Sequence, residues 1–205
     1  MLLVFAGAQG IALDPADFDC FLARWPGRPG FAWLELRLGA TPEERLHTEV
    51  AEAECWAVCR HDPLYPVGLR DTADAPWALF GRGDPELLRR LDPSGAVSVV
   101  GARRASSYGR DVARELGREL AAADLVVISG LAFGIDACAH RGAIEAGLTI
   151  AVLGCGADVA YPAAHRSLWR RIGESGLVVS ELPPGSGAWR WTAAAACESQ
   201  ISAEA

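Results

Sequence analysis

The residues best suited to chemistry in this chain are glycines and arginines that directly follow runs of β-branched residues. Gly101 follows the first run and is succeeded by Arg103 and Arg104, while Gly130 and Gly154 stand in the same position after two later runs. Glycine allows backbone N–H groups to approach an anion, and guanidinium groups match the geometry of phosphate oxygens. The residue types and their spacing therefore predict a site for a phosphate-bearing ligand.

Four short apolar runs must position these residues. The runs are 96–100, 125–129, 149–153 and 177–180, and helical patterns cover 108–123, 135–146 and 165–175 between them. Strands that are apolar throughout and alternate with helices indicate a parallel sheet that is covered on both faces. Right-handed crossovers place the carboxyl ends of such strands on one edge, where open α/β sheets bind ligands. We therefore predict an α/β fold with a partial, Rossmann-like parallel sheet of about four strands.

The chain before this sheet has an irregular pattern. We predict a small helical N-terminal region and connector over 1–92, the Rossmann-like domain over 95–192 and an aberrant tail over 193–205. A capping box at Thr41–Glu44 predicts a helix that runs to about Arg60. A short strand at 77–81 and a short helix at 85–91 complete the connector.

Helix 108–123 carries an apolar stripe. Val112, Leu116 and Leu120 recur every four residues, and arginines form a second stripe beside them. This periodicity is typical of a helix with one apolar face.

The charge of the chain is negative and unevenly distributed. The formal net charge is −7, and all 19 basic residues are arginine. Residues 1–95 hold 9 arginines against 15 acidic residues, whereas residues 96–205 hold 10 against 11. Because the whole chain lacks a basic footprint, any nucleic-acid binding must be local.

No sequence segment predicts a membrane span. The apolar run Met1–Leu13 lacks a basic region before it and is too short to cross a bilayer. We expect a cytoplasmic protein without a membrane partner.

Motifs for catalysis, metals and cofactors are weak. A chain without lysine has no P-loop, and no G-x-G-x-x-G follows the first strand. Asp136 and His140 share a helical face, which suits a buried structural pair or a proton-transfer pair, and nothing identifies a base for Cys155. Cys55 and Cys59 share a predicted helical face but lack a second ligand pair for zinc. These features favour binding over catalysis, with no metal and no cofactor.

Three strings in the second half of the chain are specific enough to indicate a family. GARRASSYG, SGLAFGIDACAH and LGCGADVAYP occur in this order, after the upstream segment DPLYPVGLRDTADAPWALFGRGD. Together they resemble the DNA-processing protein A family (DprA, also called Smf), and the resemblance covers 97–191 and the upstream segment.

The resemblance implies a bacterial cytosolic protein that is not an enzyme. Such a protein binds single-stranded DNA and loads the recombinase RecA in natural transformation and recombination. The resemblance further implies that Arg103 contacts DNA phosphate and that backbone groups of the loop after the second strand line the same pocket. The predicted contacts are Gly101, Arg103, Arg104, Ser106, Ser129, Gly130, Leu131 and Gly154.

The chain departs from the family pattern in three places. Where the family continues with H-F-P-x-R-N-R-I-I-S and further strands, this sequence reads GSGAWRWT and then 193–205. Residues 1–50 match the N-terminal domain of the family poorly, and Phe133 occupies a position that is often basic in relatives. We expect a truncated or frame-shifted product, in which the homodimer and the RecA surface of the family are in doubt.

Two alternatives remain open. LOG-type nucleoside monophosphate phosphoribohydrolases have a related sheet, but their PGGxGTxxE signature has only a distant echo at Glu181–Gly185. The second alternative is an inactive, truncated fragment.

Overall fold

The structure is a computed structural model that describes residues 3–5, 11–13, 50–72, 75–76, 78–91 and 95–187. The strands are β1 Leu3–Phe5, β2 Ile11–Leu13, β3 Trp56–Cys59, β4 Ala78–Gly83, β5 Ala96–Ser98, β6 Val126–Ser129, β7 Thr149–Val152 and β8 Leu177–Ser180. The helices are α4 Val67–Arg70, α5 Ser107–Ala122, α6 Ile135–Ala146 and α7 Arg166–Ser175, with the 3-10 helices η1 Pro85–Arg90 and η2 Ala163–His165. The predicted tail over 193–205 lies outside the described residues.

A six-stranded sheet of order β3-β4-β8-β7-β6-β5 forms the centre of the described fold. Strands β5 to β8 are parallel, as predicted, and each pairs with its neighbour in the sequence. The connector adds two antiparallel strands to the predicted sheet of about four. Strand β4, which corresponds to the short strand predicted at 77–81, pairs with β8, and β3, which was not predicted, pairs with β4. The α/β, Rossmann-like class is confirmed, while the boundaries predicted at 92 and 192 stay predictions.

The N-terminal region differs from its prediction. Residues 56–59, expected in a helix, form strand β3, because all four of these side chains are buried and the strand pairs with β4. Cys59 therefore lies in a strand, and the helical face proposed for Cys55 and Cys59 does not exist. The described residues at the start of the chain form the antiparallel pair β1–β2, and the predicted helix start at Thr41 lies outside them.

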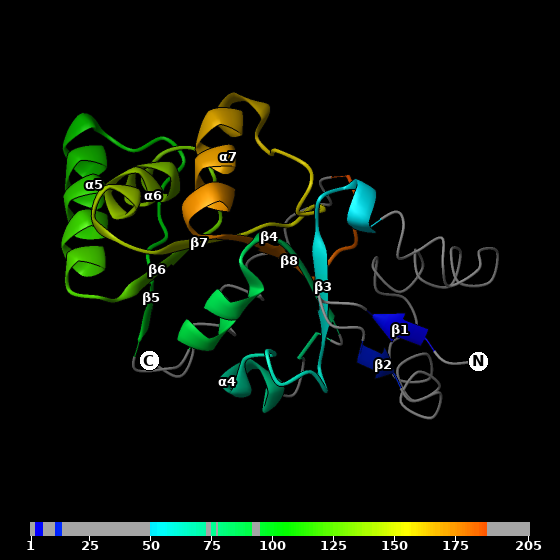
Figure 1. Cartoon of the computed structure of the whole chain (residues 1–205). Helices are drawn as coiled ribbons and strands as arrows, with labels where there is room; N and C mark the ends of the chain where they lie inside the picture. The colour runs from blue at the N-terminus through cyan, green and yellow to red at the C-terminus, as the bar shows by residue number, and fades with distance from the viewer. Residues whose placement is uncertain are drawn as a thin grey trace.

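The three long helices cover one face of the sheet, and the connector covers the other (Figure 1). Each parallel strand pairs with the next one in the chain, so right-handed crossovers all pass over the same face. Alternate strand residues consequently enter different cores: Val126 and Ile128 pack with Leu69 and Leu88 of the connector, and Val127 packs with residues of α5 and α6. Both faces are covered, as the uniformly apolar strands predicted.

Helices α5 and α6 pack through small residues. Of the predicted apolar stripe, Leu120 is half-buried against the core, whereas Val112 and Leu116 are each 45% exposed. Ala113, Gly117 and Ala121 are the buried residues of α5. A Cβ on Gly117 would lie 2.3 Å from the carbonyl oxygen of Ala139. Because Gly117 has no side chain, the backbones of α5 and α6 approach closely. This contact determines which face of α5 is turned toward α6.

We expect Gly142→Ala to destabilise the fold. A Cβ at Gly142 would lie 1.8 Å from the carbonyl oxygen of Arg114, so α5 and α6 must separate, at a cost of about 2 kcal/mol. Gly173→Ala in α7 is the matched control, because its nearest neighbour is 3.8 Å away and alanine favours a helix by roughly 1 kcal/mol. Urea unfolding of both variants measures the difference. Equal stability of the two variants would contradict the close helix contact.

A buried histidine links α6 to the sheet. His140 is fully buried, its Nδ1 lies 2.7 Å from Thr149 Oγ1, and the Thr149 hydroxyl donates to the carbonyl of Val127. Because the Thr149 hydroxyl points its own proton at that carbonyl, its oxygen accepts a hydrogen bond from His140 Nδ1–H. Burial lowers the pKa of His140 from 6.5 to about 4.

This lowered pKa predicts that acid destabilises the protein. The unfolded chain binds a proton at His140 below pH 6.5, but the folded chain does so only below about pH 4. The free energy of unfolding should therefore decrease by roughly 3 kcal/mol from this group as the pH falls through that range. Comparing denaturant unfolding of wild type and His140→Gln between pH 7 and 4 isolates the contribution. Identical pH dependence in the two proteins would contradict the assignment.

Among the described residues, no helix has the length and apolar character needed to span a membrane.

Candidate nucleic-acid interface

The loops at the carboxyl ends of the four parallel strands lie along one edge of the sheet, as predicted from the parallel strands. The loop after β5 contacts the loop after β6, since the N–H of Ile135 donates to the carbonyl of Ala102 at 3.3 Å. The loop after β7 contacts the loop after β8, since the N–H of Gly156 donates to the carbonyl of Ser186 and the N–H of Gly185 donates to the Asp158 carboxylate. The four loops are therefore joined in pairs by backbone hydrogen bonds.

Gly134 allows the first two loops to approach closely. Its φ is +83°, and an added Cβ would lie 2.1 Å from the carbonyl oxygen of Ala102 and 2.8 Å from that of Arg103. Both the backbone conformation and the space require glycine at this position. The contact fixes the arginine loop against the start of α6.

Exposed positive charge gathers in front of helix α5. Arg103 and Arg104 are exposed, and Ser106 accepts a hydrogen bond from the N–H of Gly109 at 3.1 Å as the N-cap of this 16-residue helix. Arg110 is held near the same loop, because its Nη1 donates to the carbonyl of Ala105 at 2.7 Å. The N-terminus of a helix favours anions, so the arginines and the helix dipole act in the same direction.

Two predicted contact residues turn out to be internal. Ser129 is fully buried, and its hydroxyl donates to the carbonyl of Val99 at 2.7 Å. Leu131 is also fully buried and has a positive φ of 59°, while its carbonyl accepts the Nδ1–H of His165 at 2.9 Å. These side chains position the loop after β6, and the contact expected from the backbone groups of this loop stays a prediction. Of the predicted glycines, Gly101 is exposed, and Gly130 and Gly154 are half-buried.

The buried Asp136 carboxylate interacts with backbone N–H groups of the same two loops. Its carboxylate accepts the N–H of Ala132 at 3.3 Å, and the N–H groups of Gly101 and Gly130 also lower its pKa. Burial is the larger effect and raises the pKa above its ordinary value. The predicted pairing of Asp136 with His140 is wrong, since Asp136 bonds the loops and His140 bonds Thr149. The glycine N–H groups that we expected to face an anion are thus partly engaged within the protein.

Exposed aromatic side chains, which were not among the predicted contact residues, also lie at this edge. Phe133 is 46% exposed in the loop after β6, and Tyr161 is 52% exposed in the loop after β7. Tyr108, in the first turn of α5, is also exposed. The sequence held a signal for these additional contact residues, because it places aromatic residues in loops that were predicted to meet at one edge.

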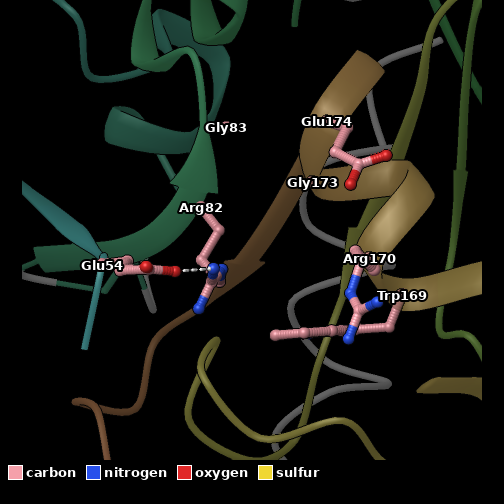
Figure 2. Close-up of a pocket in the computed structure, with 7 residues that line it drawn as sticks. All are labelled: Glu54, Arg82, Gly83, Trp169, Arg170, Gly173 and Glu174. Atoms are coloured by element: carbon pink, nitrogen blue, oxygen red, sulfur yellow. Dashed lines mark hydrogen bonds and ion pairs between the residues drawn. The ribbon is translucent and has the colours of Figure 1, made fainter. Parts of the chain in front are cut away.

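A concave site lies away from this edge, between α7 and β4 (Figure 2). It has a volume of about 470 Å³ and includes Arg82, whose guanidinium lies 4.8 Å from the centre of the Trp169 ring and forms an ion pair with Glu54. The charge of Arg82 is therefore already compensated within the protein. Arg82 pairs with Val178 within the sheet, so this site is not part of the loop edge.

The cysteine at the edge is unsuited to nucleophilic chemistry. Cys155 is buried, and desolvation raises the pKa of its thiol to about 11. Desolvation also raises the pKa of Cys55 to about 12. Thiols are nucleophilic as thiolates, so neither group is activated. The residues that the structure describes include no group of three or more histidine, cysteine, aspartate or glutamate side chains that could hold a metal ion.

Comparison with known proteins agrees with this geometry. The family model of DNA recombination-mediator protein A matches residues 56–195. The chain belongs to this family. The match includes every strand of the six-stranded sheet and all four edge loops.

Relatives and solved structures support the same assignment. The DNA processing protein DprA of Streptococcus pneumoniae is 42% identical over 125 residues, which are 60% of this chain and 43% of the relative. Its X-ray structure superposes with a TM-score of 0.69 at 33% identity, covering 87% of this chain and 60% of that chain. DNA processing protein A of Helicobacter pylori, described for its single-stranded DNA binding mode, gives a TM-score of 0.58 at 28% identity, covering 67% of this chain and 62% of that chain.

The chain spans between 30% and 43% of the length of the curated relatives it matches.

We expect Asp136→Asn to loosen the edge. An amide has one acceptor oxygen, and its NH₂ group would face N–H donors, so the substitution should cost about 1–3 kcal/mol of stability. The backbone amides of Gly101 and Gly130 should exchange with solvent faster, which hydrogen exchange by NMR measures. Asp111→Asn is the control, because Asp111 is exposed on α5. Unchanged exchange at both glycines would show that Asp136 does not hold the loops.

Proposed function

We propose that this chain binds single-stranded DNA at the loop edge, through the phosphate groups. The observation that carries the proposal is the exposed pair Arg103 and Arg104 in front of the capped N-terminus of α5. Guanidinium groups and a helix N-terminus both favour phosphate oxygens. The positive charge is local, which suits a chain whose net charge is −7.

Membership of the family supports a role in recombination. The family is described as a DNA recombination mediator, and the Helicobacter pylori protein of similar structure binds single-stranded DNA. We propose that the chain takes part in natural transformation and DNA recombination in the cytoplasm, with RecA as its protein partner. The homodimer that the resemblance implies for the family is not part of this proposal.

We further propose that the protein acts by binding and not as an enzyme. The buried thiols have raised pKa values, His140 is enclosed and bonded to Thr149, and the Nδ1–H of His165 donates to the carbonyl of Leu131. These properties disfavour an activated nucleophile at the edge. Release of free base from a nucleoside monophosphate would contradict the proposal and favour the phosphoribohydrolase alternative.

The phosphate contacts predict strongly salt-dependent binding. Fluorescence anisotropy of a labelled dT oligonucleotide should show an association constant that falls steeply between 50 and 200 mM salt, because neutralised phosphates release counterions. Arg103→Ala should weaken binding roughly ten-fold for any base sequence and reduce the magnitude of the salt slope by about 0.7. Arg89→Ala is the control, since Arg89 lies on η1 and is paired with Glu86. If Arg103→Ala and Arg89→Ala bind alike, the phosphate site is not at this edge.

A further inference from the structure

We propose that Phe133 and Tyr161 stack on DNA bases beside the arginine loop. The inference rests on the proposed function and deepens it, because phosphate contacts alone cannot distinguish an unpaired strand from a duplex. Binding of a single strand typically combines a positive groove with aromatic side chains on which bases stack. The arginines provide the first of these features, and the two aromatic residues provide the second.

The exposure of the two aromatic residues is the first observation. Phe133 is 46% exposed and Tyr161 is 52% exposed. By contrast, Tyr65 and Phe80 are almost completely buried. Phe133 and Tyr161 belong to different loops of the same edge, after β6 and after β7 respectively. Their rings are therefore available to a ligand that lies along the strand ends.

The position of Phe133 relative to Arg103 is the second observation. Phe133 directly precedes Gly134, the residue whose missing Cβ brings it against the carbonyls of Ala102 and Arg103. The N–H of Ile135 donates to the carbonyl of Ala102 within the same contact. The loop that carries the ring and the loop that carries the guanidinium thus touch, so one strand can meet both.

The surroundings of Phe133 are the third observation. Its ring meets the imidazole of His165 edge to face, with centroids 4.8 Å apart and an interplanar angle of 61°. His165 is itself fixed, because its Nδ1–H donates to the carbonyl of Leu131. Tyr161 lies in the same loop after β7 that carries His165. The ring of Phe133 is held in place before any ligand binds.

Stacking at these positions would add selectivity for unpaired strands. The bases of a duplex already stack on one another, whereas the bases of a single strand can turn outward onto a protein ring. Every base has a π-face, so the contact would tolerate any sequence. The arginines would then supply the charge, and the aromatic residues would supply the preference for single strands.

The test compares two ligands of equal charge at fixed salt, using the full 205-residue chain. One ligand is a dT oligonucleotide, and the other is an oligonucleotide of the same length in which every base is missing. Wild type should bind the dT ligand roughly ten-fold more tightly. Phe133→Leu, which keeps an apolar side chain but removes the ring, should lose most of that difference, and its affinity for the abasic ligand should not change.

The same variants separate the alternatives. Phe133→Trp should retain the preference for dT, and the salt slope should be the same in all Phe133 variants. Tyr161→Leu should reduce the preference for dT in the same way as Phe133→Leu. Equal binding of both ligands by wild type would overturn the stacking proposal while phosphate binding still stands. Equal losses on both ligands in Phe133→Leu would assign Phe133 a structural role. Failure of wild type to bind either ligand would instead contradict the proposed function.

Discussion

The close contact between the loops after β5 and β6 is the constraint on which the interface depends. Gly134 admits the carbonyls of Ala102 and Arg103 where any Cβ would collide, and the buried Asp136 carboxylate faces N–H groups from both loops. Burying a carboxylate is unfavourable unless donors surround it, so the N–H groups and the carboxylate require each other. Arg103 is consequently presented from a backbone that is held on two sides, which reduces the entropy lost when it binds a ligand.

The interface combines buried groups that hold its loops in place with exposed groups that are accessible to a ligand. Buried groups, namely the Ser129 hydroxyl, the Leu131 carbonyl and the His165 imidazole, hold the loops through hydrogen bonds. Arg103 and the Phe133 ring are exposed groups on these loops. Under the proposed function, the charge of Arg103, which acts over several ångströms, and the ring of Phe133, which acts only on contact, meet the same DNA strand. The arrangement places local positive charge on the surface of a chain whose net charge is −7.

The sheet and the loop edge were largely predictable because their signals are local. The strand and helix ranges of 126–180 agree with the apolar runs and periodicities to within one or two residues. The rotation of α5 was not predictable from periodicity, since Val112–Leu116 and Ala113–Gly117 repeat with the same spacing. Close backbone contact with α6, which begins 13 residues after the end of α5, selected the smaller residues. Strand β3 was missed for a similar reason, because its partner β4 is distant in the sequence.

The sequence by itself determined the family, the parallel sheet and the edge on which Gly101, Arg103 and Gly130 meet. Strand order and crossover handedness follow from chain connectivity, so loop positions could be read in advance. Only the tertiary structure decided which of those residues reach the surface. Burial depends on neighbours from several loops at once, and it enclosed Ser129 and Leu131 while leaving Phe133 and Tyr161 exposed. The pattern of residue types does not predict which side chains are exposed, because exposure is decided by packing between segments far apart in the chain.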